Sequence, residues 1–139
     1  MAVLAKVSLD ELWITFGVGK QFQYIAAHEI FASVGQSKSL GLPMIHDLTG
    51  CDTVSFFHGK GKKSAWQTWN SLEDLTNTFA ELHNTPESLE VNMPMLERFV
   101  ILMYDRTSAE EEINTARKVM FAQKGGERDK IPHTRDALN

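Results

Sequence analysis

The chain has 139 residues, of which 42% are hydrophobic, and this suits one modest globular domain. A net charge of −4 excludes a basic field over the whole molecule, so any contact with nucleic acid requires a local basic patch. The single cysteine, Cys51, excludes an internal disulfide and a multi-cysteine zinc site. No apolar run reaches the roughly 18 residues of a membrane span, and the first residues lack a signal-peptide pattern. We therefore expect an intracellular protein with no membrane partner, and a nuclear location stays open.

The first predicted element is a β-hairpin. Leu12–Phe16 and Gln21–Ile25 flank a glycine-containing turn and have the composition of strands. Phe22 and Tyr24 alternate with glutamines, which is the period of a half-buried strand.

Two helices are predicted after the hairpin. The first covers Ala26–Val34, with Gly35 as its C-cap. The second covers Ser37–Thr49 and ends at Gly50, and Pro43 inside it predicts a break into two pieces.

The second half of the chain predicts further helices, namely Lys62–Trp69, Leu72–His83, a central buried helix over Pro94–Asp105, and a long helix that stops at Gly125. Ser71 with Asp74 resembles a capping box for the second of these. Ser108 is predicted as the N-cap of the last, with Glu110–Glu112 in its first turn, where the helix dipole favours acids. The elements together predict a mainly α fold with a small N-terminal β-hairpin.

Three sequence patterns resemble functional motifs, but a structural role is the favoured interpretation of each. The segment 17–20 (GVGK) lacks the remaining glycine and the hydroxyl of a phosphate loop, which favours a hairpin turn. His28 begins a zinc-protease-like pattern whose last position is Ala32, so a packed or surface histidine is expected. Cys51 with His46 lacks the third group that would orient a catalytic base.

Five aromatic residues could stack nucleic-acid bases: Phe16, Phe22, Tyr24, Trp66 and Trp69. Core packing is the favoured interpretation at these spacings. Trp66 and Trp69 lie three positions apart and should share one helix face.

One segment combines a glycine turn, lysines and a helix start. Gly59 and Gly61 are separated by one residue, so the turn offers free backbone N–H groups in front of a positive helix N-terminus. The predicted phosphate-binding residues are Gly59, Lys60, Gly61, Lys62, Lys63 and Ser64. With Leu42–Thr49 before it and Lys62–Trp69 after it, the turn forms a helix–turn–helix clamp of the kind that binds backbone without reading sequence. A merely solvated lysine loop is the alternative.

This segment resembles the clamp of flap endonucleases and their 5′-nuclease relatives in the PIN-like superfamily. The family carries Gly-Cys/Ser-Asp-Tyr and then Gly-Ile-Gly-Pro-Lys-Arg-Ala, and residues 50–52 and 59–65 match with the same separation. The departures are Thr53 for Tyr, Lys60 for Ile, Lys62 for Pro and Ser64 for Arg. The resemblance covers about Tyr24–Trp69.

A closer likeness covers nearly the whole chain. The stretches ELWITFGVGKQFQYIAAHE, LPMIHDLTGCDTVSFFHGKGKKSAWQTW, LERFVILMYDRTS and IPHTRDAL resemble a group of uncharacterised, transposon-associated animal proteins. In that group a DxD-bearing strand precedes the region matched here. The resemblance implies the C-terminal half of an α/β PIN-like nuclease domain: residues 1–35 as residual core, 36–70 as the clamp, and 71–139 as a truncated helical region.

The resemblance also implies a role for Asp52, because the family's aspartate at this position helps to hold divalent metal. Mg²⁺ or Mn²⁺ would need further carboxylates, and the family carries most of them on strands before the clamp. Asp52 capping the turn after Gly50 is the alternative. We therefore expect a half-domain that binds DNA without sequence specificity and is not catalytic alone. Two alternatives stay open: a metal-dependent nuclease in a longer product, and a non-catalytic interaction module whose helix Pro94–Asp105 and following acidic helix bind an unidentified protein.

Overall fold

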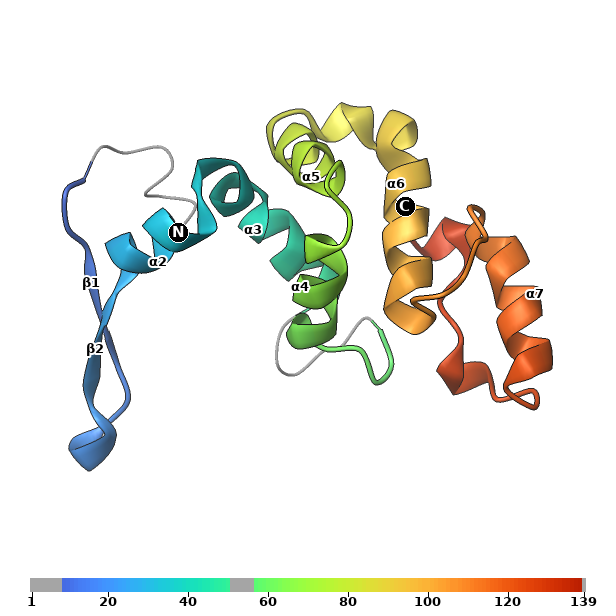
Figure 1. The fold of residues 1–139 in the computed structure, drawn as a ribbon, viewed down its shortest axis with the longest axis horizontal. Coiled ribbons are helices and arrows are strands. Elements are labelled where there is room, and N and C mark those ends of the chain that lie inside the picture. Colours follow the sequence, from blue (N-terminus) through green and yellow to red (C-terminus); the bar gives the residue numbers. More distant parts are fainter. Residues whose placement is uncertain (1–8, 51–56, 139) are drawn as a thin grey trace.

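The computed structural model describes residues 9–50 and 57–138, apart from the side chain of Asp129. Its elements are β1 (Trp13–Phe16), β2 (Gln23–Ala26), α2 (Ala27–Val34), α3 (Gln36–Thr49), α4 (Lys62–Asn70), α5 (Leu75–Asn84), α6 (Leu89–Tyr104) and α7 (Ile113–Gln123). Short 3₁₀ turns lie at Gly19–Gln21, Pro86–Ser88, Arg128–Lys130 and Arg135–Ala137. The molecule is elongated, with the hairpin at one end and α7 at the other (Figure 1). The expectation of a mainly helical fold with a small N-terminal hairpin is confirmed. In the part of the chain that the structure describes, no helix combines the length and apolarity needed to cross a membrane.

The hairpin is antiparallel, with Trp13 opposite Ala26 and Phe16 opposite Gln23. Its turn requires Gly17, whose φ is +88° and whose added Cβ would lie 2.2 Å from a backbone oxygen. The GVGK segment is therefore a hairpin connection, as predicted.

The aromatic residues of the hairpin are more exposed than the sequence pattern predicts. Phe22 is 49% exposed and Tyr24 66% exposed. Their rings pack edge-to-face on each other, with centroids 5.2 Å apart, instead of entering the core. The predictions of a half-buried strand and of core packing are wrong for these two residues, and the core prediction is also wrong for the exposed Phe16.

Helix α2 ends as predicted at Gly35, whose φ of +84° suits glycine and whose N–H donates to the carbonyl of Phe31 over 2.8 Å. Helix α3 is continuous through Pro43, so the predicted break is wrong. Proline removes one intrahelical hydrogen bond, to Ser39, and α3 packs against α5 along its length.

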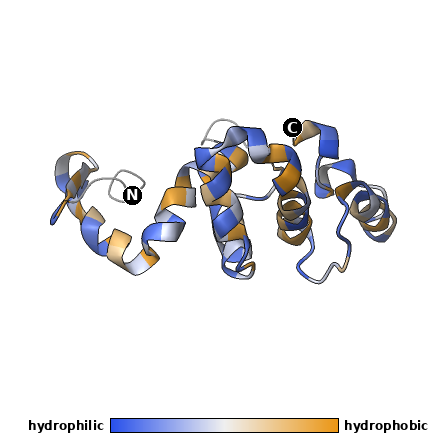
Figure 2. Ribbon diagram, turned by 90° about the horizontal axis from the view of Figure 1, so that it is seen from above, coloured by the Kyte–Doolittle hydropathy of each residue, from blue (hydrophilic) through white to orange (hydrophobic). Residues whose placement is uncertain are grey.

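Helix α3 packs tightly against the core at Gly41. A Cβ on this residue would lie 3.0 Å from Cβ of Phe79 and 3.0 Å from the indole of Trp69. Trp69, Phe79 and Phe99 continue into the core as an edge-to-face series with centroid separations of 5.1 and 5.6 Å. These rings join α4, α5 and α6, and hydrophobic residues recur along the row of helices (Figure 2).

The predicted central helix is confirmed as buried, but it begins five residues earlier, at Leu89 instead of Pro94. The turn Pro86–Ser88 leads into it, and the side-chain amide of Asn92 donates to the carbonyl of Ser88 over 3.1 Å. These contacts stabilise the turns that precede the proline.

Two predicted helix starts are wrong. The hydroxyl of Ser71 donates to the carbonyl of Thr68 over 2.7 Å, so Ser71 closes α4 and α5 begins only at Leu75. Ser108 lies outside α7 because the guanidinium of Arg98 donates to the carbonyls of Ser108 and Glu110 over 2.8 and 2.7 Å. This arginine holds the loop in a non-helical course, and Glu110 and Glu111 precede the helix instead of entering its first turn.

Candidate nucleic-acid interface

Helices α3 and α4, which precede and follow the glycine turn of the predicted clamp, pack against each other. Asp52, the candidate metal ligand, and Cys51 lie outside the described residues. Among residues 9–50 and 57–138, no group of three or more His, Cys, Asp or Glu side chains is placed to hold a metal ion.

The glycine turn is anchored in the core by Phe57, which is fully buried. The N–H of Lys60 donates to the carbonyl of Phe57 over 3.1 Å and closes a four-residue turn. Gly59 occupies the third position of this turn with a φ of +67°, a conformation that other residues rarely adopt. Gly61 follows in an extended conformation as the N-cap of α4. The sequence prediction of a glycine turn that opens a helix is confirmed.

Among the residues that the structure describes, none caps the N-terminus of α4 with a side chain. Its first helical bond runs from the N–H of Ala65 to the carbonyl of Gly61, so the N–H groups of Lys62, Lys63 and Ser64 have no intrahelical acceptor. The N-cap residue offers no side chain to them, and the first turn contains no acidic residue. Free N–H groups at the positive end of the helix dipole suit a phosphate.

The lysines of the motif diverge in their contacts. The ammonium of Lys62 donates to the carbonyl of Gly50 over 2.5 Å and to the hydroxyl of Thr49 over 3.3 Å, which ties α4 to the end of α3. The side chain of Lys63 is exposed, and its ammonium makes no hydrogen bond or ion pair with any residue that the structure describes. Lys63 is therefore the lysine most available to a ligand beside the free N–H groups.

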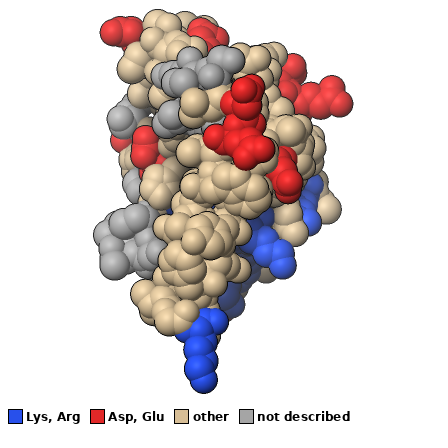
Figure 3. All heavy atoms as spheres, turned by 90° about the vertical axis from the view of Figure 1, so that its left-hand side faces the viewer, with Lys and Arg blue, Asp and Glu red and all other residues tan. Residues whose placement is uncertain are grey.

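An apolar groove with a volume of about 680 Å³ lies between α3 and α4, beside the start of α4. Leu42, Pro43 and Trp66 contribute to its walls, and Lys63 and Asp47 line it as well. Asp47 introduces negative charge close to the lysines. Charges are also segregated over the end of the molecule that carries the hairpin, with acidic groups in the upper part and basic groups in the lower part (Figure 3).

Trp66 and Trp69 share one helix face as predicted, with ring centroids 5.4 Å apart. Trp69 is buried, and its indole N–H donates to the hydroxyl of Thr76 over 3.0 Å. The ammonium of Lys38 lies 5.3 Å from the Trp66 ring centroid in a cation–π contact. Core packing is confirmed for Trp69, and Trp66 is only partly buried.

His28 is half-buried, and its Nδ1 lies 3.2 Å from the backbone N of Leu12. Its ring packs edge-to-face on Trp13, 5.3 Å away. The histidine thus joins α2 to the hairpin, in agreement with the prediction of a packed or surface histidine without a metal.

Lys60 turns away from the other motif lysines toward residues that the sequence analysis missed. Its ammonium lies 5.5 Å from the ring centroid of Tyr104, at the end of α6. Burial, followed by the nearby charges of Lys124 and Arg106, lowers the pKa of Lys60 below 10.5. The sequence signals the proximity of Lys60 and Lys124 only through the glycine pair after α7. Gly125 and Gly126, with φ of +65° and +83°, reverse the direction of the chain there.

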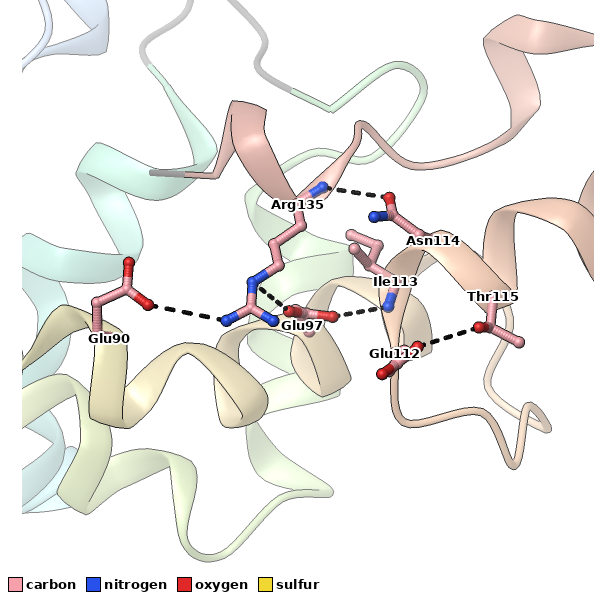
Figure 4. Close-up of polar contacts among 7 residues, drawn as sticks. All are labelled: Glu90, Glu97, Glu112, Ile113, Asn114, Thr115 and Arg135. Carbon is pink, nitrogen blue, oxygen red and sulfur yellow. Dashed lines mark hydrogen bonds and ion pairs between the residues drawn. The ribbon is translucent and has the colours of Figure 1, made fainter.

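Glu97 is a buried carboxylate, 3% exposed, that the sequence analysis also missed. One of its oxygens accepts the N–H of Ile113, the first residue of α7, over 2.8 Å. The other lies 3.2 Å from Nε of Arg135, and Glu90 reaches the same guanidinium at 3.8 Å (Figure 4). Both oxygens are engaged, so Glu97 joins α6, α7 and the C-terminal segment as a structural group.

Comparisons with protein-family models, with curated proteins and with solved structures found no match to this chain. The resemblance to 5′-nucleases therefore rests on the sequence motifs at residues 50–52 and 59–65 and stays a prediction.

Proposed function

We propose that this protein binds the phosphate backbone of DNA, without reading its sequence, through the glycine turn and the start of α4. The observation that carries the proposal is the N-terminus of α4, where three N–H groups without an acceptor among the described residues lie beside the exposed Lys63. An anion at such a position gains charge-assisted hydrogen bonds from the backbone and from the lysine.

The rest of the charge distribution implies weak binding. The net charge of −4 repels a polyanion, and Lys62 already bonds the end of α3. Each phosphate contact changes the slope of log K against log salt concentration by about 0.9 on duplex DNA, so one or two contacts give a slope of about −1 to −2. The proposed activity is therefore low in affinity and sensitive to salt.

The resemblance to PIN-like nucleases extends the proposal. On that basis, the chain supplies the C-terminal half of a nuclease domain, and Asp52 contributes one ligand to Mg²⁺ or Mn²⁺. Among the described residues, no group of three or more His, Cys, Asp or Glu side chains is placed to hold a metal ion, and we assign no cleavage step to them. The α3–turn–α4 order supports the clamp part of the resemblance.

A ¹H–¹⁵N NMR titration of the full chain with a short DNA duplex tests the proposal. We expect the amides of Lys62, Lys63 and Ser64 to shift first, because their N–H groups meet the phosphate. Shifts confined to the hairpin, or no shifts at low salt, would contradict it.

The exposed hairpin favours a second candidate function, a non-catalytic protein-interaction module. Trp13, Phe16 and Tyr24 are each more than half exposed, and exposed aromatic side chains are typical of protein contacts. Of the two helices first predicted for this role, α6 is largely buried within the core, and the role of α7 stays a prediction. This candidate predicts a concentration-dependent or partner-dependent loss of Trp13 exposure, measurable by fluorescence quenching, and no effect of DNA.

A further inference from the structure

A second, basic cavity of about 320 Å³ lies at the glycine turn, separate from the groove between α3 and α4. His58, Gly59 and Lys60 line it from the turn, Tyr104 lines it from the end of α6, and Lys124 and Lys130 come from the segment after α7. The fold thus brings cations from two segments that are far apart in sequence to one hollow.

The charges around this cavity are incompletely compensated. Lys130 has its own ion pair with Glu127, at 2.7 Å, and its carbonyl accepts the ammonium of Lys124 over 3.0 Å. In the described part of the chain, neither Lys60 nor Lys124 forms an ion pair with a carboxylate.

The acid and the other cation near these lysines have their own hydrogen bonds. The carboxylate of Asp105 accepts the N–H and the hydroxyl of Thr107 over 2.9 and 2.7 Å. The guanidinium of Arg106 donates to the side-chain carbonyl of Gln67 over 2.6 Å. Arg106 adds positive charge, and Asp105 interacts with Lys124 through space without forming an ion pair with it. The pKa of Lys60 is lowered by burial and then by Lys124 and Arg106.

We infer that this cavity binds a phosphate group, held by the ammonium groups of Lys60 and Lys124. Like charges that converge on a hollow destabilise each other, and an anion between them removes that repulsion and forms charge-assisted hydrogen bonds. The aromatic wall of Tyr104 keeps the ammonium of Lys60 in place through its cation–π contact. His58 is exposed at the same rim and adds a donor.

We take the phosphate to come from the backbone of bound DNA, and in this respect the inference rests on the proposed function. Lys60 directly precedes Gly61, the N-cap of α4, so the cavity and the helix start flank one turn. A strand bound at the helix start can therefore place a second phosphate in the cavity. A free phosphate ester has the same chemistry, and the experiment separates the two sources.

Titration of the full chain with inorganic phosphate tests the site itself. We expect the side-chain signals of Lys60 to shift and the pKa of Lys60 to rise toward 10.5, because the anion favours the charged ammonium. Lys124→Ala and Lys124→Gln should both abolish these changes, and the second keeps most of the side-chain stem if the first unfolds the segment. Lys118→Ala, which removes an exposed lysine of α7 outside the cavity, is the matched control. An unchanged pKa of Lys60, or equal responses in the Lys124 and Lys118 variants, would overturn the inference.

A parallel titration with duplex DNA identifies the source. Lys124→Ala should reduce the salt slope of binding by about one, as the loss of a phosphate contact does, and Lys118→Ala should leave it unchanged. If Lys63→Ala weakens binding but Lys124→Ala behaves like the control, DNA is not the source of the phosphate for the cavity, and the proposed function stands. If the cavity takes inorganic phosphate but the protein does not bind DNA, the proposed function fails and the cavity is a site for a free phosphate ester.

Discussion

Replacing Glu97 with alanine should destabilise the fold more than the loss of an exposed charged side chain does. The buried carboxylate accepts the N–H of Ile113, and Ile113 is fully buried, so no water can replace the lost acceptor. A hydrogen bond to a charged group contributes about 1.5 to 3 kcal/mol. Arg135 is 45% exposed, so its ion pair with Glu97 adds less than about 1 kcal/mol after solvent screening. We therefore expect Glu97→Ala to lower the free energy of unfolding by about 3 kcal/mol.

Urea unfolding followed by circular dichroism measures this loss. Glu97→Gln retains an acceptor for Ile113 without the charge, and it should cost only about 1 kcal/mol. Glu90→Ala is the matched control, because Glu90 is exposed and approaches Arg135 only to 3.8 Å; its effect should stay within about 0.5 kcal/mol. If Glu97→Ala is no more harmful than Glu90→Ala, the carboxylate does not stabilise the start of α7 and the reasoning is refuted.

Three further changes have defined outcomes. Gly41→Ala places a methyl group 3.0 Å from Trp69 and should cost about 1 kcal/mol in thermal unfolding, since overpacking exceeds the gain in helix propensity; a stabilised variant would contradict this. Hydrogen bonds from the Thr107 hydroxyl and N–H hold the pKa of Asp105 below 3.8, so the stability contributed by this aspartate is present above pH 3.8 and is lost as the pH falls through the lower folded-state pKa. Thr107→Val should move that pKa up toward 3.8 in an NMR titration, and no movement would exclude the hydroxyl as the cause. Lys62→Ala should lower the free energy of unfolding by about 1 kcal/mol, because it removes the hydrogen bond to the carbonyl of Gly50; unchanged stability would show that this bond does not stabilise the fold.

Local patterns predict those parts of the fold that depend on local contacts. The hairpin turn needs a glycine such as Gly17, and Gly35 and Gly59 have the positive φ values that their turns require. The start of α4 follows from the same glycine chemistry, so the candidate phosphate site at Lys62–Ser64 was visible in the sequence.

Long-range contacts explain the errors. Pro43 does not interrupt α3, because α5 packs along that helix, and Ser108 does not cap α7, because Arg98 captures the loop before it. Lys124 reaches the cavity beside Lys60 only through tertiary packing and the turn after α7, so no spacing in the sequence predicts this pair. The structural role of Glu97 could not be predicted for the same reason, since its partners Ile113 and Arg135 lie 16 or more residues away in the sequence.

The salt dependence of DNA binding by Lys63→Ala tests the central claim most directly. Fluorescence anisotropy with a labelled duplex is compared for the natural protein, Lys63→Ala and Lys20→Ala, an exposed lysine in the hairpin turn, between about 50 and 200 mM salt. We predict that the natural protein binds weakly with a negative slope, that Lys63→Ala reduces both affinity and slope, and that Lys20→Ala matches the natural protein. Equal effects of the two substitutions, or binding that is independent of salt, would contradict the assignment of the α4 N-terminus as the phosphate-binding site.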